Sequence, residues 1–213
     1  MRAVIFANGL LENVERALEA AQNAELIIAA NGGSLHCLRL GIEPTLVVGD
    51  LDSLDAVARQ TLEASGTEFI AHPPDKDQTD LELALLSAVA LNATKIVVLG
   101  ATGGRLDMTL ANVHLLTLPE LGDIQVELWR GDQTAILLRP PGGPIGGRIG
   151  DGISLIPIGG EARSITTMDL QYALDGEDLD LGPARGVSNL INGPDPRVEL
   201  ENGLLLIVHT PEP

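Results

Sequence analysis

The sequence changes character near residue 120, and this change limits the possible folds more than any other feature. Before it, short apolar runs such as 26–30 and 95–99 alternate with segments of helical periodicity such as 81–91. Continuous apolar strands that alternate with helices predict a mostly parallel sheet with helices on both faces. We therefore expect an α/β domain over residues 1–122.

Residues 123–213 lose the helical periodicity and carry short β-prone runs separated by Gly and Pro, for example 153–157 and 204–208. This pattern predicts a second domain, a small antiparallel sandwich or barrel. Gly and Pro are densest in PPGGPIGG at 140–147, and we expect this stretch to be a mobile hairpin tip.

The net charge of −17 restricts the partners of the chain. Such a field repels nucleic acid and anionic membranes, so we expect neither, and a nucleotide would need help from local cations, helix N-termini or a metal. The single cysteine, Cys37, fits a reducing compartment. No apolar stretch approaches the roughly 20 residues of a membrane span. The sequence thus predicts a cytoplasmic protein with small-molecule partners.

The segment GDLDS at 49–53 follows an apolar run at 45–48. Ligands bind outside the carboxyl ends of the strands in open α/β sheets, so this segment is well placed for function. Asp50 and Asp52 alternate along an extended segment and would point the same way, which suits Mg²⁺. The alternative interpretation is an Asx-turn that caps the next helix through Asp52 or Ser53.

A second acidic segment, DKDQTD at 75–80, precedes the helical pattern. Thr79 begins a capping-box pattern, which places Asp80 in the first helical turn. A favourable interaction with the helix dipole would explain well why position 80 is acidic, and would partly explain Asp77. It does not explain the acidic residue at position 75. If both acidic segments share one sheet edge, their carboxylates repel each other and would recruit a divalent cation that also binds phosphate.

Two glycine-containing turns, ANGG at 30–33 and GATGGRLDM at 100–108, each follow an apolar run. Such turns let backbone N–H groups approach a phosphate, although neither matches a P-loop or a dinucleotide fingerprint. Arg105 supplies a cation for an anionic substrate, and Asp107 would hold Arg105 or accept from a ribose hydroxyl. The alternatives are a surface ion pair at a helix start and a plain strand–helix loop.

These four segments, in this order, resemble the thiamine pyrophosphokinase family. The pattern of that family is A-[DN]-G-G, G-D-x-D-S, D-K-D-x-T-D and G-x-x-G-G-R-x-D-H, and this chain reads ANGG, GDLDS, DKDQTD and GATGGRLDM. RGVSN at 185–189 and GLLLIV at 203–208 resemble the C-terminal domain of the family. The resemblance spans nearly the whole chain. It departs at Met108, where the family usually has histidine, and this departure bears on the acceptor substrate.

The resemblance implies transfer of a diphosphate from ATP to thiamine, which gives thiamine diphosphate and AMP, with Mg²⁺ as cofactor. It implies a Rossmann-like α/β domain, a C-terminal β-sandwich and a homodimer with composite active sites. The catalytic and metal-binding acids would be Asp50, Asp52, Asp77 and Asp80. The nucleotide-binding residues would be Asn31, Gly32, Gly33, Gln78, Thr79, Gly103, Gly104, Arg105 and Asp107. Ser188 and Asn189 would contact thiamine across the dimer.

Two other functions compete with this one. The first is a diphosphokinase for another hydroxyalkyl heterocycle, such as hydroxymethylpterin. The second is a non-catalytic protein that binds a nucleotide or a metal. An assay for turnover would distinguish the non-catalytic protein from the two diphosphokinases.

Overall fold

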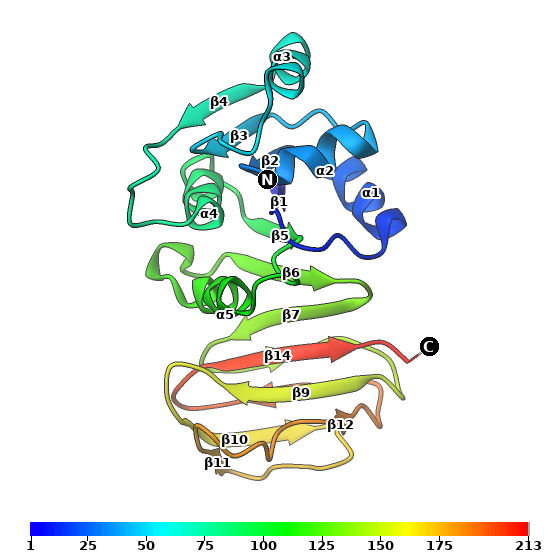
Figure 1. The fold of residues 1–213 in the computed structure, drawn as a ribbon. Helices are drawn as coiled ribbons and strands as arrows, with labels where there is room; N and C mark the ends of the chain where they lie inside the picture. Colours follow the sequence, from blue (N-terminus) through cyan, green and yellow to red (C-terminus); the bar gives the residue numbers. More distant parts are fainter. Residues whose placement is uncertain (213) are drawn as a thin grey trace. The chain divides into compact units, whose positions relative to one another are not determined.

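The structure, a computed structural model, describes residues 1–212 and consists of two compact units, Met1–Gly131 and Asp132–Pro213 (Figure 1). The division falls later than residue 122, because the strand at 125–130 pairs in parallel with a strand of the first unit. None of the helices in the described residues is long and apolar enough to cross a membrane.

The first unit is built on six strands, all of them paired in parallel. They are β1 (Arg2–Phe6), β2 (Leu26–Ala30), β3 (Leu46–Gly49), β4 (Glu68–Ala71), β5 (Lys95–Leu99) and β6 (Gln125–Arg130). Successive side chains of a strand point to opposite faces, and Val4 and Ile5 are both fully buried. The sheet is therefore covered on both faces, as the continuous apolar runs predict.

The helices of the first unit follow the expected pattern. They are α1 (Val14–Gln22), α2 (Gly33–Leu40), α3 (Ala56–Ala64), α4 (Asp80–Ala90) and α5 (Leu106–His114), followed by the short 3₁₀ helices η1 (Leu115–Thr117) and η2 (Pro119–Leu121). α4 buries Leu81, Ala84, Leu85 and Ala88 on one face. Leu91, the last residue of the helical pattern at 81–91, is the C-cap of α4 and is 45% exposed.

The strand order of the first unit is β6-β5-β1-β2-β3-β4. The chain therefore runs outward from β1 through β2, β3 and β4, and then returns to add β5 on the other side of β1. The loops after β1 and β5 leave these neighbouring strands in opposite directions. This is a topological switch point, where open α/β sheets bind their ligands.

The second unit contains two antiparallel sheets with one shared core. The first has the order β12-β9-β14-β7 within the unit, with β7 (Gln133–Leu138), β9 (Gly152–Pro157), β12 (Asn189–Leu190) and β14 (Leu205–Thr210). The second has the order β11-β10-β13-β8, with β8 (Gly142–Pro144), β10 (Ala162–Met168), β11 (Glu177–Leu179) and β13 (Arg197–Glu199). Leu155 from the first sheet packs in one buried cluster with Ile165 and Val198 from the second, so the unit is a β-sandwich.

The glycine-rich stretch at 140–147 is not simply a hairpin tip, contrary to our expectation. Residues Gly142–Pro144 form the edge strand β8, which pairs with β13. A Cβ at Gly142 would lie 2.2 Å from the carbonyl oxygen of Val198, and its φ of 85° is one that glycine favours. Glycine here allows close pairing, which the composition of the stretch alone does not reveal.

Candidate functional site

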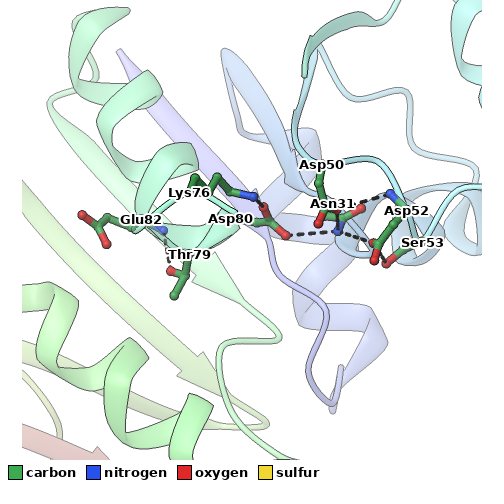
Figure 2. A network of polar contacts seen from close by, with 8 residues as sticks. All are labelled: Asn31, Asp50, Asp52, Ser53, Lys76, Thr79, Asp80 and Glu82. Carbon is green, nitrogen blue, oxygen red and sulfur yellow. Dashed lines mark hydrogen bonds and ion pairs between the residues drawn. The ribbon is translucent and has the colours of Figure 1, made fainter. Parts of the chain in front are cut away.

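The side chain of Asn31, directly after β2, brings three carboxylates together (Figure 2). Its Nδ2 donates to Asp50 Oδ1 at 2.7 Å, to Asp52 Oδ1 at 2.9 Å and to Asp80 Oδ2 at 3.1 Å. The two acidic segments therefore meet at one edge of the sheet, as the sequence predicts. Asn31 is the amide that joins them.

Local backbone geometry makes this convergence possible. Asn31 has φ 44°, a left-handed conformation that asparagine tolerates better than most residues. Gly49 ends β3 with φ 148°, and a Cβ there would lie 2.9 Å from Asp80 Oδ1. The hydroxyl of Thr79 accepts from Glu82 N and caps α4, which confirms the expected helix start and fixes Asp80 in the first turn.

The network has more acceptors than donors. One amide nitrogen carries two hydrogens, yet three carboxylates compete for them. Lys76 Nζ lies 3.0 Å from Asp80 Oδ1, but this ion pair lacks hydrogen-bond geometry, so among the described residues that buried oxygen has no donor. The hydrogen bond from Asn31, followed by contacts with Asp50 and Ser53, holds the pKa of Asp52 below its ordinary value. The network therefore contains more carboxylate oxygens than the described residues supply with donors.

A pocket of about 460 Å³ lies beside this network, at the switch point of the sheet. It is lined by Ala7, Asn8, Gly9, Leu10, Ala30, Asn31, Gly32, Asp80, Leu81, Gly100, Ala101, Gly103, Gly104, Arg105, Met108 and Asn112. The lining comes from the loops after β1, β2 and β5, from the start of α4 and from α5. Because Asn31 and Asp80 belong to both, the acidic network forms one wall of the pocket.

The loop after β1 is a part of the pocket that sequence reasoning missed. Gly9 N donates to Gly100 O at 2.7 Å, and Leu10 N donates to Thr102 O at 2.8 Å, so this loop is bonded to the loop after β5. A Cβ at Gly9 would lie 2.3 Å from Gly100 O, which only glycine avoids. The sequence does contain a turn-forming pair, Asn8-Gly9, directly after the first apolar run. This pair could be recognised as part of the pocket only if β1 and β5 were known to be neighbours.

Arg105 lines the pocket and also pairs with Asp107 through two hydrogen bonds, from Nε and Nη2. The side chains are 74% and 65% exposed, so solvent screens this pair. The hydrogen bond with Asp107 raises the pKa of Arg105, and the same contact lowers the pKa of Asp107. Asp107 therefore holds Arg105 at the rim, where the cation is accessible to an anionic ligand.

Several predicted site residues lie outside the network. Asp75, Asp77 and Gln78 are exposed, and none of the polar contacts found within residues 1–212 involves them. Gly33 is buried at the start of α2, where a Cβ would lie 1.9 Å from the carbonyl oxygen of Phe6. The close approach of α2 to β1 therefore requires glycine at position 33.

The second unit contains the segment expected to contact thiamine. Ser188 is exposed, with its backbone N–H donating to Ser154 Oγ at 3.2 Å. Asn189 is only 5% exposed, and its amide bonds to the backbone of Tyr172 and Leu190. Asn189 therefore holds this segment in place, whereas Ser188 offers an exposed side chain to a ligand.

The acidic network offers oxygen ligands for a cation. Within residues 1–212, no group of three or more His, Cys, Asp or Glu side chains is arranged so that it could hold a metal ion by itself. Mg²⁺ typically takes only one or two protein carboxylates and completes its shell with substrate phosphates and water. Asp50, Asp52 and Asp80 supply hard oxygen atoms, and Asp80 Oδ1 has no hydrogen-bond donor among the described residues, so the chemistry of these residues fits Mg²⁺.

Comparisons with known proteins give a consistent result. The family model described as thiamin pyrophosphokinase, catalytic domain, matches residues 17–128, and the one described as thiamin pyrophosphokinase, vitamin B1 binding domain, matches residues 145–205. A relative named thiamine pyrophosphokinase from Bacillus subtilis (strain 168) is 29% identical over 187 residues, which cover 87% of either chain. Thiamine pyrophosphokinase 1 from Oryza sativa subsp. japonica is 27% identical, over 79% of this chain and 67% of the relative.

Solved structures agree with the sequence comparisons. The crystal structure of thiamine pyrophosphokinase from Bacillus subtilis superposes with a TM-score of 0.87 and 25% identity, over 100% of both chains. Thiamin pyrophosphokinase from Candida albicans, at 16% identity, has a TM-score of 0.83 over 99% of this chain and 89% of that one. This second likeness shows that the fold persists at low identity.

Proposed function

This chain belongs to the thiamin pyrophosphokinase family, and we infer that it makes thiamine diphosphate from thiamine, with ATP as the diphosphate donor. The observation that carries the mechanism is the acidic network of Asp50, Asp52 and Asp80 in the wall of the switch-point pocket. An excess of carboxylate oxygens beside a pocket lined by glycine turns suits a metal-bound polyphosphate.

Asp50, Asp52 and Asp80 hold Mg²⁺ in this proposal, and Asp77 joins them from the exposed loop before α4. When bound, Mg²⁺ neutralises phosphate charge and orients the diphosphate for transfer. Asn31 keeps the three acids in place through its hydrogen bonds. Lys76, paired with Asp80, is close enough to the site to contact a phosphate as well.

The transfer itself needs positioning more than a strong base. The hydroxyl oxygen of thiamine attacks the β-phosphorus of ATP, the bond from that phosphorus to the bridging α,β oxygen breaks, and AMP leaves. An ionised acid of the network orients the attacking hydroxyl and accepts its proton. Arg105 at the pocket rim contacts the nucleotide phosphates, and the turns containing Gly32, Gly103 and Gly104 provide close backbone approach.

The second unit supplies the thiamine contacts, with Ser188 as the direct contact and Asn189 as the residue that positions it. The protein acts as a homodimer in which this segment completes the active site, an assignment supported by the RGVSN motif at 185–189. A cytoplasmic location is supported by the single free cysteine, Cys37, which is buried. Burial raises the pKa of this thiol to about 12.

The competing acceptor, a hydroxymethylpterin, is not favoured. The relatives are named for thiamine, and a vitamin B1 binding domain matches residues 145–205. A non-catalytic role is likewise not favoured, because the named relatives are kinases.

The test is an assay with ATP, Mg²⁺ and thiamine that measures AMP and thiamine diphosphate. We expect the two products in equal amounts, and no AMP when thiamine is omitted. AMP release with hydroxymethylpterin but not with thiamine would mean that the pterin is the acceptor substrate. Absence of turnover with either acceptor would favour the hypothesis of a non-catalytic protein that binds a nucleotide or a metal.

A further inference from the structure

Asn112, on α5, is a buried polar residue that the mechanism above does not use. It is 6% exposed and lines the switch-point pocket one helical turn after Met108. Its Oδ1 is buried and has no hydrogen-bond partner among the described residues. A buried acceptor without a donor is costly in a folded protein, so its presence in a pocket wall points to a missing ligand group.

The hydrogen bond made by the amide nitrogen of Asn112 fixes the orientation of this side chain. Nδ2 of Asn112 donates to the carbonyl oxygen of Ala101 at 2.7 Å. A carbonyl oxygen only accepts, so the nitrogen must face Ala101 and the oxygen must be the unpaired atom. The unpaired group of Asn112, a residue that lines the pocket, is therefore an acceptor and not a donor.

The neighbours of Asn112 indicate what kind of donor fits. Leu10, Leu81 and Met108 give the pocket an apolar wall, which suits the face of a flat aromatic ring. Met108 and Asn112 lie four residues apart on the same side of α5 and both line the pocket, so a ring that packs on Met108 would lie near Asn112. The ligand group is thus a hydrogen-bond donor on the edge of a ring.

We propose that Asn112 is a specificity-determining residue that accepts a hydrogen bond from the 6-amino group of the adenine of ATP. This inference rests on the proposed function, because it assigns the base of the nucleotide to the same pocket. A 6-oxo purine such as that of GTP presents an acceptor at this position and would leave two acceptors facing each other. Asn112 would thereby select for adenine among the purine nucleotides.

The test compares ATP with purine riboside triphosphate, in which hydrogen replaces the 6-amino group. Thiamine is the acceptor throughout, and kcat/KM is measured for each nucleotide. For the unmodified protein we expect ATP to be favoured by at least about tenfold, since the analogue leaves Oδ1 unpaired. In Asn112→Ala the preference should fall to within about twofold, because the acceptor is gone. Leu110→Ala, on the exposed side of α5, should keep the full preference.

Three results would overturn the proposal. The first is equal use of ATP and the analogue by the unmodified protein, a measurement that needs no variant to fold. The second is a preference that survives in Asn112→Ala. The third is that Asn112→Ala instead erases a preference for ATP over 2′-deoxy-ATP or 3′-deoxy-ATP, which would assign the contact to ribose. No turnover with ATP would overturn the proposed function too, whereas normal ATP turnover with equal use of the analogue would overturn only the role of Asn112.

Discussion

Both units contain a cluster built on aspartate, and the two clusters differ in how their acceptors are filled. In the second unit, Asp151 accepts from Arg148 N at 2.8 Å, from Glu212 N at 2.9 Å and from the His209 ring at 2.7 Å. In the first unit, Asp50, Asp52 and Asp80 share the amide of Asn31. Backbone N–H groups and a histidine of the chain satisfy the carboxylate of Asp151, whereas the shared network leaves Asp80 Oδ1 without a hydrogen-bond donor among the described residues.

The buried asparagines show the same contrast. Asn189 in the second unit uses both ends of its amide on backbone groups. Asn112 in the first unit uses only its nitrogen. Unfilled acceptors therefore concentrate around the switch-point pocket, which is where a ligand would fill them.

The largest expected effect is that of Asp80→Asn. The change keeps the shape of the side chain but removes a charge from the network, so we expect kcat/KM to fall at least about 100-fold while the protein stays folded. AMP release measures kcat/KM, and a thermal melt shows whether the variant stays folded. Asp151→Asn is the matched control and should retain turnover; a similar loss in both variants would erase the distinction between the clusters.

A smaller effect is expected for Arg105→Ala. Because Arg105 lies at the pocket rim beside Asp107, its loss should raise KM for ATP about tenfold with little change in KM for thiamine. Arg59→Ala removes a comparable exposed ion pair, with Glu63 on α3, and should change neither constant. An unchanged KM for ATP in Arg105→Ala would mean that Arg105 forms only a surface ion pair with Asp107 and does not contact the nucleotide.

The smallest effect is on stability and belongs to Asp151→Asn. Burial alone would raise the pKa of Asp151, but the N–H groups of Glu212 and Arg148 and the ring of His209 lower it to about 2. The carboxylate therefore stabilises the protein above its ordinary pKa, and this contribution is lost as pH falls toward 2. We expect the variant to be less stable by about 1–2 kcal/mol at pH 7.

Thermal melts of both proteins across pH measure this contribution. The difference in melting temperature between the unmodified protein and Asp151→Asn should shrink as pH falls from about 4 toward 2. A difference that stays constant over this range would mean that the ionised form of Asp151 contributes nothing.

The sequence predicts the sheet well because its strands are continuous apolar runs, and it predicts the start of α4 because Thr79 is a capping residue. It also indicates that Asp50, Asp52 and Asp80 meet if their two segments share one sheet edge, and the structure shows that they do. It could not reveal Gly9 or Asn112 as pocket residues, because strand order and burial depend on contacts between distant segments. For the same reason, the sequence alone could not show that Asn189 is buried.

The proposed metal site can be tested by Mn²⁺ binding, measured by electron paramagnetic resonance with a non-hydrolysable ATP analogue present. Mn²⁺ substitutes for Mg²⁺ at oxygen sites. We expect the unmodified protein and Asp151→Asn to bind Mn²⁺ with the same affinity, and Asp80→Asn to bind at least about tenfold more weakly. Equal affinity in all three proteins would contradict the assignment of the Asn31-centred acids as the metal site.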